Sequence, residues 1–368
     1  MSSSTETIHV AGAGIGGLAT AVALQQQGVP VVVHDRAREL TPVGAGISVW
    51  PNAVLALESL GVSGLRGGSI PRGGAGLYRW DGEPLATNAG EAIERRYGAP
   101  LVLLHRAELQ QALLQALTPE SIRLGETLVS SEQADGHVTL HFADGSADSG
   151  ALLVGADGLR STVRAQLLGD DPPRDSGLVA HRGVVALDAP ALAGELWGPH
   201  GVFGLAPLSG SRVYWYATQR AGDTRDLLDA FGEWASPVPE VLSRAEDILR
   251  HPLYDRPPAR RWTHGRATLL GDAAHPMLPF LGQGACQAIE DAVAIGSAVA
   301  EYGAVPEALR AYERARRKRA AMLVKRSRTA GRVAHLRSAW QRGVRDALVR
   351  HMPDGARFRQ LDAAIGAP

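Results

Sequence analysis

The stretch Ile8-His9-Val10-Ala11-Gly12-Ala13-Gly14-Ile15-Gly16-Gly17 decides the fold of this chain. Its first four residues predict a short buried strand, and residues 18–27 predict a helix. Gly12, Gly14 and Gly17 have the spacing of the dinucleotide fingerprint, in which small residues permit a tight turn, close backbone approach to a pyrophosphate, and packing of the helix on the strand. The N-terminus of the helix would then face the anion.

An acidic residue follows the next predicted strand, Val31 to Val33. Asp35 lies 23 residues after Gly12, near the offset at which a carboxylate accepts hydrogen bonds from ribose hydroxyls. Arg36 is included in the same predicted cofactor-binding segment. The alternative is a glycine-rich turn beside an ordinary surface aspartate, but strand, glycines, helix, strand and acid in this order favour a nucleotide. A nicotinamide dehydrogenase would share these residues, so this motif alone does not choose the cofactor.

Two later motifs each follow a predicted buried strand. The first is Gly155-Ala156-Asp157-Gly158, and the second is Gly271-Asp272. Pro279-Phe280-Leu281-Gly282-Gln283-Gly284 then precedes a long predicted helix, where backbone amides could face an anion or an electron-rich ring. Either motif could also be a simple turn, with Asp272 capping a helix. A ligand that touches all of them has to reach across the whole domain, which a mononucleotide would not do.

Composition excludes several classes of protein. The 368 residues are 45% hydrophobic, which suffices for a large core and favours two domains. Lys and Arg number 38, as do Asp and Glu, so no net charge attracts nucleic acid or an anionic membrane. The arginine-rich residues 310–337 are therefore interpreted as a solvated helix face rather than an RNA-binding helix. Cys286 is the only cysteine, so no intramolecular disulfide can form, and we predict a cytoplasmic protein. Residues 292–300 are too few for a membrane span, and Met1 to Ser4 lacks the basic start of a secretion signal.

Together, Gly12-x-Gly14-x-x-Gly17, Asp157-Gly158 and Gly271-Asp272 with Pro279-x-x-Gly282-Gln283-Gly284 resemble the class A, single-component FAD-dependent aromatic hydroxylases, typified by p-hydroxybenzoate and salicylate hydroxylases. The resemblance covers most of the chain. It implies bound FAD with these contacts: Asp35 at the adenosine ribose, Arg106 reaching the FAD, Asp272 at the ribityl chain or pyrophosphate, Pro279 to Gly284 along the isoalloxazine, and Gly44-Ala45-Gly46-Ile47 on its other side. Asp157 would serve both FAD and a nicotinamide coenzyme.

The predicted fold is α/β, with a Rossmann-like FAD-binding domain interleaved with an antiparallel-sheet substrate domain and followed by C-terminal helices. Residues 1–175 are predicted to form the first part of the FAD-binding domain. They include a small antiparallel insert assembled from Ile122 to Leu124 and Val138 to Phe142. The remaining predicted ranges are 176–262 for the substrate domain, 263–305 for the returning FAD-binding segment, and 306–368 for the helical region.

The resemblance also implies a reaction. NADH or NADPH would bind transiently and reduce FAD, O₂ would add at flavin C4a, and the hydroperoxide would deliver one oxygen atom to an aromatic or heteroaromatic small molecule. An epoxidase, a flavin-dependent halogenase, a reductase and a non-catalytic flavin binder remain alternatives. Against the halogenase, the chain has no Trp-x-Trp-x-x-Pro segment and no lysine between the first and last motifs. We expect a monomer or a homodimer.

The substrate pocket is expected between the flavin and the sheet of the second domain. Tyr214 and Tyr216 share one face of a predicted strand, while Trp215 takes the other, because side chains alternate. His181 and Arg182 lie on a neighbouring predicted strand, where a histidine could deprotonate a phenol and an arginine could bind a carboxylate. The alternatives are ordinary core aromatics and solvated surface residues.

Overall fold

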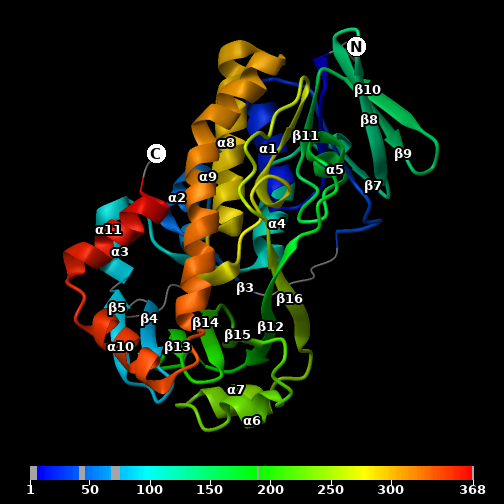
Figure 1. Cartoon of the computed structure of the whole chain (residues 1–368). Helices are drawn as coiled ribbons and strands as arrows, with labels where there is room; N and C mark the ends of the chain where they lie inside the picture. The colour runs from blue at the N-terminus through cyan, green and yellow to red at the C-terminus, as the bar shows by residue number, and fades with distance from the viewer. Residues whose placement is uncertain (1–5, 41–45, 68–74, 89, 189, 367–368) are drawn as a thin grey trace.

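A five-stranded parallel sheet carries the glycine motif. The computed structural model describes residues 6–40, 46–67, 75–88, 90–188 and 190–366 (Figure 1). The order of the sheet is β17-β11-β1-β2-β7, with all neighbours parallel. Its strands are β1 (Ile8–Ala11), β2 (Val31–Asp35), β7 (Ile122–Leu124), β11 (Leu152–Gly155) and β17 (Ala267–Leu269). Strands β1, β11 and β17 are buried along their whole length, as expected for a parallel sheet covered on both faces.

Helices cover this sheet and fix the glycine turn against it. The main ones are α1 (Ile15–Gln26), α2 (Pro51–Ser59), α4 (Arg106–Gln115) and α8 (Gly284–Tyr302). Helix α1 lies against α8, where a Cβ at Gly296 would be 2.9 Å from the Ala23 side chain. The two helices can therefore approach closely only because position 296 has no side chain. The predicted Rossmann-like architecture is confirmed.

The antiparallel insert has three strands, of which only the one over residues 138–142 was predicted. It consists of β8 (Leu128–Ala134), β9 (His137–Phe142) and β10 (Ala147–Gly150), and α5 (Thr162–Leu168) follows β11. Residues 122–124, predicted to belong to this insert, instead form β7, which pairs in parallel with β2. That part of the prediction is wrong, because three residues carry too little alternation to indicate which sheet a strand joins.

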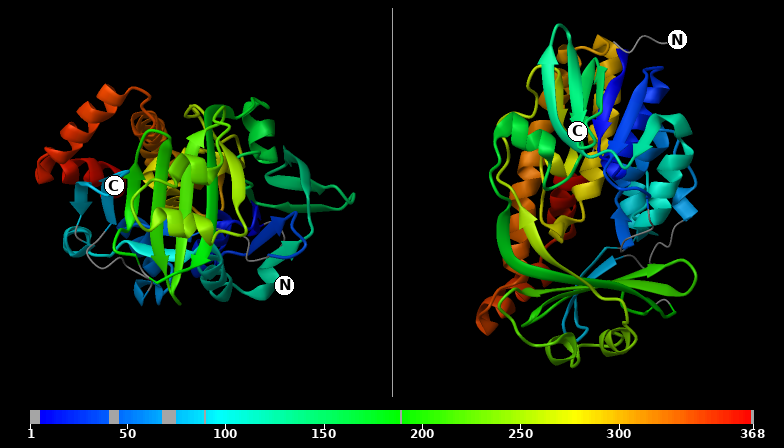
Figure 2. Two further views of the ribbon diagram at one scale, coloured as in Figure 1. Left: turned by 90° about the horizontal axis from the view of Figure 1, so that it is seen from below. Right: turned by 90° about the vertical axis from the view of Figure 1, so that its right-hand side faces the viewer.

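The second sheet has seven strands in the order β16-β12-β15-β14-β13-β4-β5. They are β4 (Ala75–Arg79), β5 (Pro84–Asn88), β12 (Arg174–Ala186), β13 (Gly194–Trp197), β14 (Gly201–Leu208), β15 (Arg212–Arg220) and β16 (Leu249–Asp255). Pairing is antiparallel except between β13 and β4. In the right-hand view of Figure 2 this sheet forms a layer across the base of the first domain. Strands β4 and β5 join it although residues 1–175 were predicted to form the other domain, because Tyr78 and Trp80 pack against its core.

Further elements cover or connect the two sheets. Helices α6 (Leu227–Phe231) and α7 (Val238–Ser243) bury one face of the seven-stranded sheet around Trp215 and Phe203. Strands β3 (Gly46–Val49) and β6 (Val102–His105) form a small antiparallel pair. The other elements are α3 (Gly90–Tyr97), α10 (Ala339–Arg350), α11 (Asp354–Ile365) and the 3-10 turns η2 (Leu65–Gly67), η3 (Pro119–Ser121), η4 (Gly271–Ala273) and η5 (Pro279–Leu281).

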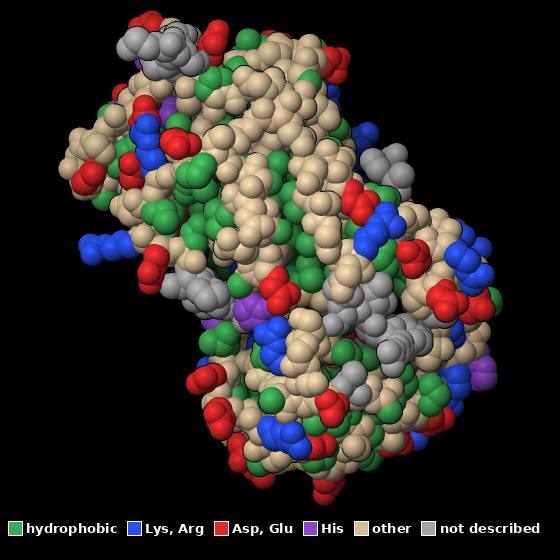
Figure 3. Space-filling model, turned by 180° about the vertical axis from the view of Figure 1, so that it is seen from behind, with side chains coloured by type: hydrophobic (Ala, Val, Ile, Leu, Met, Phe, Trp, Pro, Cys, Tyr) green, Lys and Arg blue, Asp and Glu red, His purple; other side chains and the backbone are tan. Residues whose placement is uncertain are grey.

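The long helix α9 (Pro306–Ala334) runs beside α8 and continues down to the seven-stranded sheet (Figure 1). It is only partly the solvated face predicted from its arginines, because Arg316 is buried and paired with Asp291. On the face shown in Figure 3, acidic and basic side chains are interspersed. None of the helices in the described part of the chain has the length and apolar character that crossing a membrane requires.

Candidate functional site

The glycine turn leaves space in front of α1. Gly12 has φ +109°, and a Cβ there would lie 2.5 Å from the carbonyl oxygen of Ala156. A Cβ at Gly17 would overlap the carbonyl oxygen of Gly12, whereas a Cβ at Gly14 would meet no atom within 4 Å. Gly14 is the N-cap of α1 and provides no side-chain cap. The first N–H groups of the helix therefore face open space, which fits an anion such as a pyrophosphate.

Asp35 is held beside this turn. Its carboxylate accepts hydrogen bonds from the backbone N–H of Ala13 at 2.7 Å and of Ala37 at 2.8 Å. Gln110, a residue that sequence reasoning missed, donates to the carbonyl of Ala13 at 3.3 Å. Arg36 is exposed next to Asp35. The position at the carboxyl end of β2 fits the predicted contact between Asp35 and a ribose.

The three sequence motifs lie side by side because they follow adjacent strands. The Ala156 N–H donates to Ala11 at 2.8 Å, and the Leu270 N–H donates to Gly155 at 2.9 Å. Arg164 ties the middle motif to the last one, since its guanidinium donates to the carbonyls of Ala273 at 2.8 Å and Ala274 at 3.2 Å. One extended ligand could thus contact all three motifs.

Asp157 has one carboxylate oxygen engaged and one without a partner. Oδ2 accepts from the Val163 N–H at 3.2 Å, at the start of α5. Oδ1 is buried and has no hydrogen-bond partner within the described residues. Burial raises the pKa of Asp157, whereas hydrogen bonds from Ser161 and from backbone N–H groups lower it. A buried acceptor without a protein partner can accept a hydrogen bond from a hydroxyl group of a bound ligand.

The last motif forms two short turns. Asp272 lies on η4 with its side chain exposed. Loss of hydration among the surrounding protein atoms raises the pKa of Asp272, while the charges of His275 and Arg106 act in the opposite direction. Arg106 itself is exposed at the first position of α4. Asp272 and Arg106 are therefore close enough for their charges to attract each other.

Pro279 begins η5, and the chain then turns into α8. Gly282 has φ +61°, and a Cβ there would lie 2.8 Å from Nε1 of Trp50. A Cβ at Gly284 would meet nothing within 4 Å, and α8 has no side-chain cap at its N-terminus. The first turn of α8 therefore offers a second set of free backbone donors. Gly44 and Ala45, predicted on the opposite side of the flavin, lie outside the described residues, whereas Gly46 is in β3.

A buried polar network supports the Gly271–Asp272 turn from behind. Asp291 of α8 accepts from the Gly271 N–H at 3.2 Å, contacts His275 Nε2 at 2.6 Å, and accepts from Arg316 Nε at 2.8 Å. Burial alone would raise the pKa of Asp291, but attraction to His275 and Arg316 lowers it to about 2. The ionised carboxylate therefore fixes the turn to both α8 and α9.

The two predicted tyrosines face the first domain. A Cβ at Gly46 would lie 2.5 Å from the ring of Tyr214. The Tyr216 ring lies over Gly204, which has no side chain to block it, and its hydroxyl donates to Oε1 of Glu195. Trp197 Nε1 donates to Oε2 of the same carboxylate at 2.9 Å. Glu195 was not predicted, because nothing in the sequence indicates that β13 lies two strands from β15.

His181 does not join this group. It pairs in register with Ala217, whereas Arg182 pairs with Tyr216, so His181 points to the opposite face of the sheet. Burial, followed by the charge of Arg250, lowers the pKa of His181. This register contradicts the prediction that places His181 beside the tyrosines, whereas Arg182 shares the face of Tyr216.

Comparison with known proteins identifies the ligand that this geometry fits. The family model for the FAD binding domain matches residues 4–327. The chain belongs to this FAD-binding family. It is 38% identical to aurachin C monooxygenase/isomerase of Stigmatella aurantiaca, over 94% of each chain, and 38% identical to 3-amino-4-hydroxybenzoate 2-monooxygenase of Streptomyces cremeus, over 94% of this chain and 92% of that one. The structure of Klebsiella pneumoniae HpxO complexed with FAD and uric acid superposes with a TM-score of 0.90 at 31% identity, covering 98% and 97% of the two chains.

The residues present fit FAD. Gly14 and Gly284 lie at the N-termini of α1 and α8, which have no side-chain cap, and both positions have open space around them. Asp157, whose Oδ1 has no partner within the described residues, follows β11, the strand between β1 and β17. The protein is thus an FAD-dependent monooxygenase, and the comparisons do not favour an epoxidase, a halogenase or a reductase.

Proposed function

We propose that this enzyme hydroxylates a small, hydroxyl-bearing aromatic or heteroaromatic ring, which binds between the last motif and the tyrosine face of the seven-stranded sheet. The observation that carries the proposal is the group formed by Tyr216, Glu195 and Trp197 on the face turned toward Gly46. The names of two similar proteins point to the same class of substrate, an aminohydroxybenzoate in one and uric acid in the other.

The cofactor roles of the motif residues follow from their positions. The N-termini of α1 and α8 would hold the phosphates and the flavin ring, Asp35 the adenosine ribose, and Arg106 and Asp272 the ribityl and pyrophosphate region. When bound, FAD supplies the transfer of electrons from NADH or NADPH to O₂ and the insertion of one oxygen atom into the substrate. The protein supplies position and a site from which water is excluded.

Tyr216 and Glu195 would draw a proton from the substrate hydroxyl. The Tyr216 oxygen can accept a hydrogen bond from the substrate while its own hydroxyl donates to Glu195. Burial raises the pKa of Glu195 and, together with Glu195, raises the pKa of Tyr216 well above its ordinary value. Tyr216 therefore stays protonated, and a proton can pass through it to Glu195. Loss of this proton makes the ring more electron-rich and more reactive toward an electrophilic oxygen.

The function is tested by screening phenols, aminohydroxybenzoates, purines and quinolones for compounds that accelerate oxidation of NADH or NADPH by the purified protein. Labelled O₂ and mass spectrometry then identify the product. We expect one labelled oxygen atom in the product of the best substrate. Incorporation of halide instead of oxygen, or no coenzyme oxidation with any candidate, would contradict the proposal.

Tyr216→Phe and Glu195→Gln are expected to lower kcat for hydroxylation by about a hundredfold while FAD stays bound, because the proton path is interrupted. Much of the coenzyme consumed should then yield H₂O₂ rather than product, which is measured as the ratio of product to coenzyme. Tyr302→Phe is the matched comparison, since Tyr302 is 43% exposed at the end of α8. Equal coupling in all three variants would remove Tyr216 and Glu195 from the site. The cytoplasmic location and the choice between monomer and homodimer stay predictions.

A further inference from the structure

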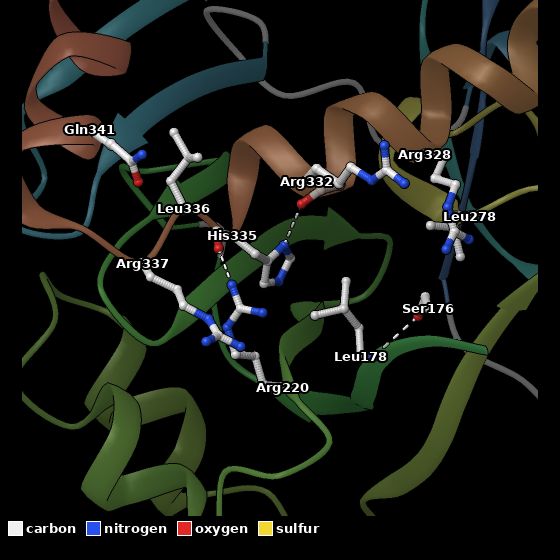
Figure 4. A pocket seen from close by; sticks show the side chains of 11 residues that line it. Ser176, Leu178, Arg220, Leu278, Arg328, Arg332, His335, Leu336, Arg337 and Gln341 are labelled. Atoms are coloured by element: carbon white, nitrogen blue, oxygen red, sulfur yellow. Dashed lines mark hydrogen bonds between the residues drawn. The ribbon is translucent and has the colours of Figure 1, made fainter.

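An arginine-rich pocket lies beside the last cofactor motif (Figure 4). Its volume is about 310 Å³, and its lining contains no acidic side chain. The polar lining residues are Ser176, Arg220, Arg328, Arg332, His335, Arg337 and Gln341. Four guanidinium groups around one small cavity have the charge that suits an anion, and arginine matches phosphate oxygens with two parallel hydrogen bonds.

This pocket is separate from the proposed substrate site. Arg220 follows Tyr216 by four residues on β15, which places it about 13 Å further along the same face. Between them Thr218 contacts His335, and the His335 ring lies 5.4 Å from the ring of Phe280. Phe280 belongs to the motif predicted along the isoalloxazine. The pocket therefore begins beyond Thr218, two residues along β15 from Tyr216.

The four arginines differ in what already engages them. Arg328 donates to the buried Asp255 at 2.8 Å, and Arg220 donates to the carbonyl of His335. Arg332 and Arg337 are exposed, and within the described residues no acidic side chain pairs with either. Burial lowers the pKa of Arg220, and repulsion from the charge of Arg337 lowers it further. Figure 4 shows these two side chains together at one end of the pocket, with Arg328 beside Leu278 at the other. An anion would relieve the repulsion.

A short path of residues joins the pocket to the Asp157 loop. Asp255, the partner of Arg328, is followed by Arg256, whose guanidinium donates to the carbonyl of Leu159 at 3.3 Å. Leu278 lines the pocket and directly precedes Pro279. The pocket thus touches the segment that leads into Pro279, and Asp255 and Arg256 link it to the loop that carries Asp157. A ligand that lies against Leu278 is next to the segment Pro279 to Gly284, which is expected along the flavin ring.

We infer that this pocket binds phosphate groups of the nicotinamide dinucleotide that reduces FAD. The inference rests on the proposed function, which requires NADH or NADPH but does not say where the coenzyme docks. Arg332 and Arg337 supply the charge, while Arg220 and Arg328, which are held by other contacts, shape the cavity.

The test is anaerobic, rapid-mixing reduction of the FAD-loaded enzyme by NADH and by NADPH. The double variant Arg332→Gln/Arg337→Gln is expected to raise the coenzyme Kd at least about tenfold, since hydrogen bonds to charged groups are lost. Its limiting rate of flavin reduction at saturating coenzyme should match the wild type. Arg332→Lys/Arg337→Lys should recover part of the affinity. Arg314→Gln/Arg326→Gln removes the same charge from exposed positions of α9 outside the pocket and should leave the Kd unchanged.

The outcomes are distinct. A larger effect on NADPH than on NADH assigns the pocket to the 2′-phosphate, and equal effects assign it to the pyrophosphate; both support the inference. Unchanged Kd values for both coenzymes, or an effect confined to the KM of an anionic aromatic substrate, would overturn it while the proposed function stands. If neither coenzyme reduces the wild-type flavin, the proposed function fails and the inference fails with it.

Discussion

Gly14→Val is expected to give a folded protein that is purified without flavin. Gly14 has φ −71° and ψ 175°, a conformation open to any residue, and a Cβ there meets no protein atom within 4 Å. The added methyl groups would instead occupy the space in front of the α1 N–H groups. Loss of two hydrogen bonds to a pyrophosphate, at about 1.5–3 kcal/mol each, weakens FAD binding by at least about a hundredfold. The ratio of flavin to protein absorbance and a titration with FAD measure this loss.

Gly17→Val provides the contrast. A Cβ at position 17 overlaps the Gly12 carbonyl, so this variant is expected to lose stability as well as flavin. Urea unfolding followed by circular dichroism should place apo Gly14→Val within about 1 kcal/mol of the wild-type apoprotein, since the change is only at an N-cap. Full flavin occupancy in Gly14→Val would show that the pyrophosphate lies elsewhere. Equal destabilisation of both variants would show that position 14 has no free space.

The cofactor side of the molecule could be predicted because its signals are local. Each motif follows directly on a buried strand, and strands of an open parallel sheet present their carboxyl ends at one edge. The order of β17, β11 and β1 then brings Gly271, Asp157 and Gly12 together. Positions that have no room for a side chain can also be recognised in a sequence, because they are occupied by glycine, as at Gly12 and Gly17.

The substrate side could be predicted only in part because it depends on pairing between distant strands. Alternation along β15 correctly separated Tyr214 and Tyr216 from Trp215. It could not show that His181 pairs with Ala217, and one residue of register decides which face a side chain takes. Nor could it reveal Glu195, which reaches Tyr216 across β14 only because position 204 is glycine.

Asp291→Asn is expected to lower the free energy of unfolding by about 3 kcal/mol at neutral pH, because it removes one partner from a buried ion pair. Arg316 Nε loses the Asp291 carboxylate at 2.8 Å, but Arg316 Nη1 keeps Glu290 Oε2 at 2.6 Å. The remaining ion pair limits the loss of stability. The Gly271–Asp272 turn also loses a charged acceptor, so FAD binding should weaken together with stability. Urea unfolding measures the first effect and FAD titration the second. Glu307→Gln, which removes an exposed pair with Arg310, should change stability by less than about 1 kcal/mol.

The pH dependence of the same variant separates charge from shape. The folded-state pKa of Asp291 is about 2, below its unfolded value of about 3.9, so its ionisation stabilises the fold fully above the unfolded value. That contribution, about 3 kcal/mol, is lost as pH falls through the folded pKa, and about half of it should be gone at pH 3. The difference between wild type and Asp291→Asn should therefore shrink between pH 5 and pH 3. A difference that stays constant over this range would mean that the asparagine disrupts packing, and that the charge of Asp291 does not hold the Gly271–Asp272 turn in place.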